Sequence, residues 1–124
     1  MSLVLIVEDN ERNLKLVRDV LQAKGYATLE AGTAEEGLKL ASERLPALIL
    51  MDIHLPGMSG IEALRALRAE AATAAIPVIA ITASVMQESV REVMAAGFNA
   101  LIEKPINVLG FLDTVRNVLG APPP

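Results

Sequence analysis

The stretch that decides the fold is Leu48-Ile49-Leu50-Met51-Asp52-Ile53-His54-Leu55-Pro56-Gly57. Its first four residues are large and apolar, which is typical of a parallel strand that is buried on both faces. Pro56 lacks an N–H and fixes φ, and Gly57 allows tight backbone geometry, so a rigid turn follows the strand. Asp52 therefore stands where the strand ends, at the edge where open α/β sheets bind their ligands.

The same alternation of strand and helix patterns extends along the whole chain. The short apolar runs are Leu3–Val7, Ala27–Glu30, Ala47–Met51, Val78–Ile81 and Ala100–Ile102. The segments of helical period are Glu11–Lys24, Ala34–Arg44, Gly60–Ala71, Val85–Ala96 and Val108–Leu119. Five strand–helix units in regular alternation predict an α/β fold of the (βα)5 type, a doubly wound parallel five-stranded sheet with helices on both faces.

Turn and cap residues support these boundaries. Capping-box pairs stand before three of the helical segments, at Thr33–Glu36, Ser59–Glu62 and Ser84–Gln87. Glycines fall where helices should end, at Gly25, Gly97 and Gly120. The run Ala27-Thr28-Leu29-Glu30 alternates in polarity, which predicts an edge strand. We expect one domain over residues 1–120, followed by a short proline-rich tail, residues 121–124, that cannot continue a helix.

Composition narrows the classes of function. The chain has 124 residues, of which 52% are hydrophobic, so it is long enough for a real core. A net charge of −4 and an aromatic content of 2% argue against direct binding of nucleic acid, which favours basic charge and stacking rings. The absence of cysteine excludes disulfides and thiolate metal sites. We find neither a signal peptide nor an apolar run that could cross a membrane, so we expect a cytoplasmic protein.

Three acidic residues form the first candidate site. Glu8 and Asp9 end the first apolar run as Asp52 ends the third, so the three carboxylates converge if those strands are neighbours. Such a cluster repels itself unless a cation or a proton intervenes, and Mg²⁺ prefers oxygen ligands. We expect Asp9 to bind Mg²⁺ directly and Glu8 to hold it through water. The alternative is that Asp9 or Asn10 only caps the next helix and Asp52 only forms a turn.

Residues after the other strands add to this site. A carboxylate beside a divalent cation can attack phosphorus, which makes Asp52 a candidate nucleophile. Thr82 ends the fourth run and could donate to a phosphoryl oxygen, as could the backbone N–H of the small Ala83. Lys104, confined by Pro105, would offset the acidic charge and pair with a phosphoryl group. The ring of His54 has no expected role, but its backbone carbonyl could reach the cation.

Together these residues resemble the receiver domain of two-component response regulators. The matching elements are Leu5-Ile6-Val7-Glu8-Asp9-Asn10, Leu50-Met51-Asp52-Ile53-His54-Leu55-Pro56-Gly57-Met58-Ser59-Gly60, Ala80-Ile81-Thr82-Ala83 and Lys104-Pro105. They occur in the family's order and spacing over essentially the whole chain. Among receivers, the sequence is most similar to single-domain regulators of the DivK type.

The resemblance implies a CheY-like, flavodoxin-like fold with strand order 2-1-3-4-5. It implies that Asp52 accepts a phosphoryl group from a histidine kinase or phosphotransferase in a phosphorelay. Mg²⁺ would be held by Asp9, Asp52 and the backbone carbonyl of His54, with Glu8 contributing through water. Thr82, Lys104 and the N–H of Ala83 would bind the phosphoryl oxygens. A downstream protein would then recognise the face formed by the fourth helix, fifth strand and fifth helix.

One position departs from the family pattern. Many receivers carry an aromatic switch residue three positions before the lysine, and here that residue is Leu101. A leucine can change its packing, but it has no hydroxyl to anchor either state. The resemblance to receivers implies a signalling domain that catalyses only its own phosphotransfer and slow autodephosphorylation. The alternatives are a constitutive pseudo-receiver that binds partners without phosphate, or a receiver excised from a hybrid histidine kinase.

Two enzyme classes fit less well. A phosphatase of the haloacid dehalogenase type usually has a second aspartate two residues after its nucleophile, where this chain has His54. A flavodoxin-like protein that binds FMN needs a first loop rich in Ser, Thr and Gly, whereas Glu8-Asp9-Asn10-Glu11 would repel a phosphate.

Overall fold

The computed structural model describes residues 2–83 and 87–120. Strands and helices alternate as expected. The elements are β1 Leu3–Val7, α1 Glu11–Ala23, β2 Ala27–Ala31, α2 Ala34–Arg44, β3 Leu48–Asp52, α3 Gly60–Ala69, β4 Val78–Thr82, α4 Gln87–Ala96, β5 Ala100–Glu103 and α5 Val108–Leu119. The predicted cap at Ser84 and the predicted tail, residues 121–124, lie outside the described residues.

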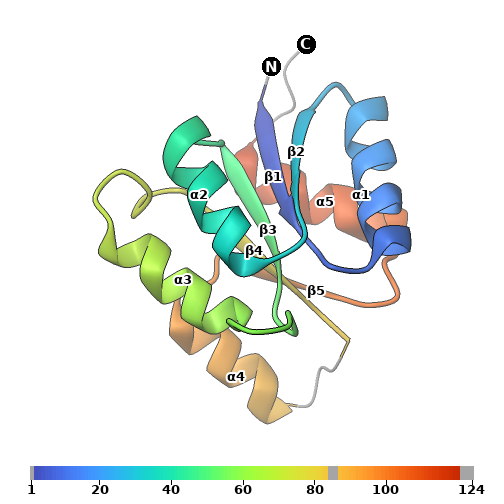
Figure 1. Ribbon diagram of the computed structural model, residues 1–124. Coiled ribbons are helices and arrows are strands. Elements are labelled where there is room, and N and C mark those ends of the chain that lie inside the picture. The colour runs from blue at the N-terminus through green and yellow to red at the C-terminus, as the bar shows by residue number, and fades with distance from the viewer. Residues whose placement is uncertain (1, 84–86, 121–124) are drawn as a thin grey trace.

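All five strands are parallel and lie in the order β2-β1-β3-β4-β5. The predicted fold class and strand order are therefore confirmed. Helices α2, α3 and α4 cover one face of the sheet, and α1 and α5 cover the other (Figure 1). Among the described helices, none has the length and apolar character needed to span a bilayer.

The central strands supply side chains to two separate cores because successive residues of a strand point to opposite faces. In β3, Ile49 and Met51 belong to the core under α2, α3 and α4. Leu48 and Leu50 belong to the core under α1 and α5. Every residue of β3 is buried, as the apolar run predicted. By contrast, β2 lies at the sheet edge with only Ala31 fully buried, which confirms the edge assignment.

Side-chain caps begin four of the helices. Thr33 Oγ1 accepts a hydrogen bond from the N–H of Glu36, and Ser59 Oγ accepts one from the N–H of Glu62, as predicted. Asn10 and Asn107 cap α1 and α5 in the same way. These bonds satisfy backbone N–H groups that a helix start leaves without partners.

Glycines shape the turn that follows Asp52. Gly57 has a φ of +78°, a value that favours glycine over other residues. A Cβ at Gly60 would lie 2.7 Å from the carbonyl oxygen of Asp52 and 2.8 Å from Cα of Ile53. Only glycine at position 60 therefore lets α3 begin directly against the backbone of the Asp52 turn, and the φ of Gly57 agrees with its predicted role.

A single arginine ties three segments together at the amino end of β4. The guanidinium of Arg68, on α3, donates to the carbonyl oxygens of Ala74 and Ile76 at 3.1 and 2.6 Å. It also donates to Oδ1 of Asn99 at 3.1 Å, and Asn99 Oδ1 accepts the N–H of Val78 at 2.9 Å. Arg68 thereby holds the loop before β4 and the turn before β5 to the end of α3.

Candidate acidic site at the carboxyl edge of the sheet

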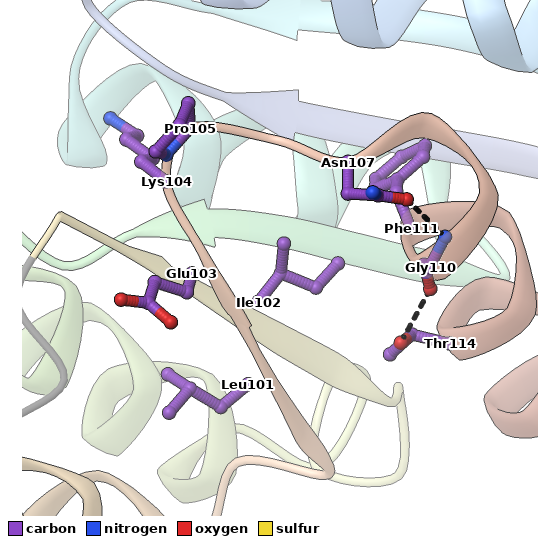
Figure 2. A pocket seen from close by; sticks show the side chains of 9 residues that line it. All are labelled: Leu101, Ile102, Glu103, Lys104, Pro105, Asn107, Gly110, Phe111 and Thr114. Atoms are coloured by element: carbon purple, nitrogen blue, oxygen red, sulfur yellow. Dashed lines mark hydrogen bonds between the residues drawn. The ribbon is translucent and has the colours of Figure 1, made fainter.

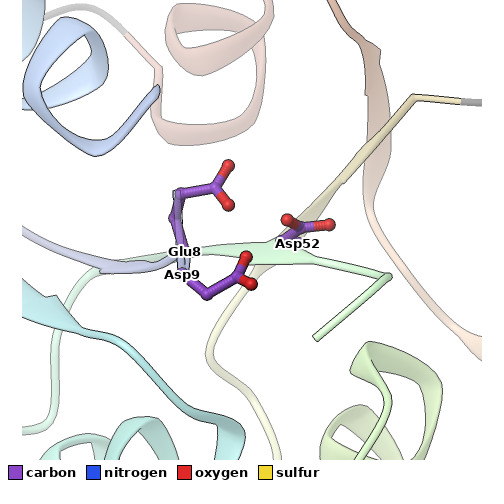
Figure 3. A group of neighbouring side chains, drawn as sticks. All are labelled: Glu8, Asp9 and Asp52. Atoms are coloured by element: carbon purple, nitrogen blue, oxygen red, sulfur yellow. The ribbon is translucent and has the colours of Figure 1, made fainter. Parts of the chain in front are cut away.

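The register of the central strands brings the predicted acids together. Val7 of β1 lies beside Met51 of β3, so Glu8, Asp9 and Asp52 follow neighbouring strand ends. Each of the three offers a carboxylate oxygen, and these oxygens lie within 4.8 Å of one another (Figure 3). Glu8 and Asp52 are buried, whereas Asp9 is exposed. The predicted convergence of the three carboxylates is present in the structure.

Lys104 bridges the two buried carboxylates. Its Nζ lies 2.9 Å from Oε1 of Glu8 and 2.9 Å from Oδ2 of Asp52. The contact with Asp52 has hydrogen-bond geometry, whereas Oε1 of Glu8 accepts no well-formed hydrogen bond from a described residue and meets Lys104 as an ion pair. The N–H of Lys104 donates to the carbonyl of Thr82 at 2.8 Å, which fixes the lysine beside the end of β4. The Lys104–Pro105 peptide bond is cis.

Backbone N–H groups complete the surroundings of the buried acids. The N–H of His54 donates to Oδ1 of Asp52 at 2.9 Å, and the N–H of Asn10 donates to Oε2 of Glu8 at 3.2 Å. Asn10 therefore serves two purposes, because its side chain also caps α1. The side chain of His54 is exposed. The predicted contact of its carbonyl with a cation stays a prediction.

The pKa values of the two buried carboxyl groups shift in opposite directions. Burial, followed by the contact with Asp52, raises the pKa of Glu8 to about 7 from 4.5. Burial alone would also raise the pKa of Asp52, but contacts with Glu8, Lys104 and the N–H of His54 hold that pKa below its usual value. Without a bound cation, Glu8 therefore keeps its proton below about pH 7, while Asp52 is ionised.

The donor set fits a hard divalent cation. Three ionised carboxylates against one ammonium would leave a formal charge of −2 in a largely buried site. Burial, followed by the contact with Asp52, raises the pKa of Glu8, and its Oε1 has no hydrogen-bond partner among the described residues, so a cation would relieve both. Carboxylate oxygens are the ligands that Mg²⁺ prefers in proteins. The cluster can thus bind Mg²⁺ in place of the proton on Glu8.

The remaining predicted residues lie around this cluster. Thr82 is buried at the end of β4, and Ala83 follows it with its side chain exposed. Leu101 is half-buried and packs against the core under α2, α3 and α4. Leu101 and Lys104 both line a pocket of about 480 Å³ between β5 and α5 (Figure 2). Of the residues that contact the buried carboxylates, Lys104 is the one that also lines this pocket.

Sequence reasoning placed these residues correctly but missed part of the local geometry. The residue Glu8 is 2% exposed and contacts Lys104 directly, which sequence reasoning did not predict. The signal was available, because Glu8 continues a fully apolar run whose side chains are buried on both faces. Its expected contact with Mg²⁺ through water stays a prediction. The double role of Asn10, which contacts Glu8 and caps α1, needed the three-dimensional path of the loop.

Comparison with known proteins gives a single family. A family model described as the response regulator receiver domain matches residues 4–116. The chain is 45% identical over 117 residues to the polar-differentiation response regulator DivK of Brucella ovis. This match covers 94% of this chain and 95% of that protein. The DivK protein of Brucella anthropi matches equally well.

Solved structures give the same result. The chemotaxis protein CheY4 of Vibrio cholerae superposes with a TM-score of 0.90 at 29% identity, covering 96% of this chain and 99% of that one. The receiver domain of the sensor histidine kinase PA1611 of Pseudomonas aeruginosa superposes with a TM-score of 0.89 at 28% identity, covering 97% and 98%. That domain was solved with a magnesium ion coordinated in its active site cleft.

Proposed function

The chain belongs to the response regulator receiver domain family, and on that premise we propose that Asp52 accepts a phosphoryl group from a phosphohistidine on a histidine kinase or phosphotransferase. An oxygen of Asp52 attacks phosphorus, the bond between phosphorus and the histidine nitrogen breaks, and its electron pair returns to the imidazole ring. The observation that carries this proposal is the position of Asp52, a buried carboxylate that contacts Lys104 at 2.9 Å beside two further acids.

The neighbours of Asp52 have separate tasks in this proposal. The N–H of His54 orients the Asp52 carboxylate through Oδ1. Lys104 would move from its two present carboxylate partners to pair with the transferred phosphoryl group, because a charge-assisted hydrogen bond favours the more negative acceptor. Thr82 and the N–H of Ala83 would donate to other phosphoryl oxygens. Phosphoryl transfer depends chiefly on such positioning and charge stabilisation.

A divalent cation would complete the charge balance. Asp9, Asp52 and the carbonyl of His54 would hold Mg²⁺, with Glu8 contributing through water. When bound, Mg²⁺ would supply positive charge at the developing phosphoryl oxygens. Glu8 would then lose the proton that burial and Asp52 impose on it, because the cation stabilises the ionised form.

Phosphorylation would be reported through the surface beside Lys104. A contact between Thr82 and a phosphoryl group would draw the end of β4 toward Asp52, and the segment that follows leads into α4. We expect the face formed by α4, β5 and α5 to change its affinity for a downstream protein as the populations of two packings shift. Leu101 is half-buried on this face, so its repacking would take the place of an aromatic switch.

A small phosphodonor tests the nucleophile directly. Wild-type protein mixed with acetyl phosphate and Mg²⁺ should gain one phosphoryl group by intact-mass spectrometry, and the product should be labile to hydroxylamine as an acyl phosphate. Asp52→Asn should not be labelled. Asp113→Asn, which alters an exposed carboxylate on α5, provides the matched control and should be labelled like wild type. Equal labelling of Asp52→Asn would refute the assignment.

A further inference from the structure

A second pocket lies between the end of α1 and α5. It has a volume of about 250 Å³ and is lined by Lys24, Tyr26, Leu109, Leu112 and Arg116. Lys24 caps the end of α1, and Tyr26 directly precedes β2. Tyr26 therefore stands at the amino edge of a parallel sheet whose carboxyl edge carries Asp52. We call this feature the α1–α5 pocket.

Tyr26, which lines the α1–α5 pocket, carries a polar atom without a partner among the described residues. The residue is 3% exposed, and its N–H is held by the carbonyl of Leu21 at 3.1 Å. Its Oη is buried and has no hydrogen-bond partner among the described residues. A buried hydroxyl without a partner lowers stability, and native structures contain few of them. The phenol is therefore available as a donor to a group that enters the pocket.

The other polar lining residues are both cations. Lys24 is exposed and takes part in no ion pair within residues 2–83 and 87–120. Arg116 donates to Oδ1 of Asp113 at 2.7 Å, but both side chains are more than half exposed, so solvent screens this pair. Two cations and one phenol offer donors to the α1–α5 pocket, and an anion is the complementary group.

Two leucines of the pocket indicate that the ligand also has an apolar part. Leu112 is buried against the core, whereas Leu109 is 76% exposed, the highest value among the large hydrophobic residues described. Pockets for small ligands usually have volumes of about 300–1,000 Å³. The α1–α5 pocket is smaller and suits one aliphatic side chain. An exposed leucine beside it gains protection from water only when a larger surface covers it.

We propose that the α1–α5 pocket is a docking site for a partner protein that inserts an aliphatic side chain with a carboxylate next to it. The aliphatic group packs on Leu109 and Leu112. The carboxylate lies between Lys24 and Arg116 and accepts the hydrogen bond of Tyr26 Oη. Because this Oη is buried, the exposed side chains of Lys24, Leu109 and Arg116 must first turn outward to admit the carboxylate. This docking goes beyond the proposed phosphotransfer and does not depend on Asp52.

NMR with chemically defined probes tests the site. Isocaproate, which joins an isopentyl group to a carboxylate, should shift the backbone amide signals of Tyr26, Leu112 and Arg116 in a saturable way. Isocaproamide has the same shape without the charge and should bind about tenfold more weakly, as expected for a lost charged hydrogen bond. The peptide acetyl-Ser-Asp-Leu-Ser-amide should shift the same signals. Binding of isocaproate without binding of the peptide would overturn docking of a protein segment.

Variants distinguish specific binding in the α1–α5 pocket from general effects of charge or stability. Tyr26→Phe should weaken isocaproate binding about tenfold and leave the free energy of unfolding unchanged or higher, because it removes an unpartnered hydroxyl. Lys24→Met should weaken binding, while Lys39→Met, an exposed lysine on α2, should not. Asp52→Asn should bind the probes like wild type, so failure of the phosphotransfer proposal leaves this result untouched. Unchanged binding by Tyr26→Phe would refute the site.

Discussion

Glu8 should make the cation-free protein lose stability as pH rises toward neutrality. The pKa of Glu8 is about 7 in the folded chain and 4.5 in the reference state. Between these values the folded protein holds a proton that the unfolded protein releases, so the free energy of unfolding falls as pH rises. The stabilising contribution is complete below about pH 4.5 and is lost as pH passes through about 7.

The magnitude follows from the two pKa values. At about 1.4 kcal/mol per tenfold change in proton affinity, the difference corresponds to about 3 kcal/mol. Glu8→Gln keeps the shape of the protonated acid but cannot ionise. In buffers with EDTA, urea denaturation should therefore show Glu8→Gln gaining about 3 kcal/mol over wild type between about pH 5 and pH 8.

A control and a second measurement sharpen this test. Glu43→Gln alters an exposed carboxylate on α2 and corrects for the general loss of one acid. Mg²⁺ should stabilise wild type more at about pH 8 than at about pH 5, because the cation competes with the proton for the same carboxylates. If the stability difference between Glu8→Gln and wild type is the same at both pH values, Glu8 does not hold the excess proton and the charge analysis is wrong.

Three other substitutions test how the fold supports the site. Gly60→Ala should cost about 1–3 kcal/mol in urea denaturation, because its Cβ meets backbone atoms at 2.7 and 2.8 Å, whereas Gly32→Ala meets nothing within 4 Å and serves as its control. Arg68→Met should speed amide hydrogen exchange at the start of β4, because Arg68 and Asn99 hold the segments before β4 and β5 in place. Exchange in β1 should stay unchanged and serves as the control. Asn107→Ala should cost about 1 kcal/mol in thermal or urea unfolding through loss of the α5 cap, and an unchanged midpoint would exclude that role.

Local sequence patterns were sufficient to predict the strands, the helices and their order. The fully apolar run Leu48–Met51 identified a central strand because burial on both faces leaves no polar position. Thr33 and Ser59 marked helix starts because their hydroxyls satisfy N–H groups only a few residues away. Each of these predictions depends on contacts within one turn or one strand. An exception is Leu45, whose φ of 46° at the end of α2 has no sequence signal of the kind that glycine provides.

Features that depend on distant residues were harder to predict. The tie from Arg68 to Asn99 joins residues 31 positions apart, and neither side chain differs in type from an ordinary surface residue. The unpartnered Oη of Tyr26 is defined by everything that surrounds it, so the sequence offered no indication of it. Sequence motifs report contacts made within an element, whereas these features arise where separate elements meet.

The acidic site depends partly on local sequence and partly on contacts between separate elements. This explains why the positions of its residues were predictable while its charge state was not. Each carboxylate was recognisable from its position after a strand, and parallel register then brought the strand ends together. The proton on Glu8 depends on how deeply this acid is buried. It also depends on the ammonium group of Lys104, which contacts both Glu8 and Asp52 at 2.9 Å. Replacing that lysine's partners changes the charge balance of the whole cluster. A cation and a phosphoryl group would both compete for the contacts that Lys104 and Glu8 now share, so binding of one should alter the affinity for the other.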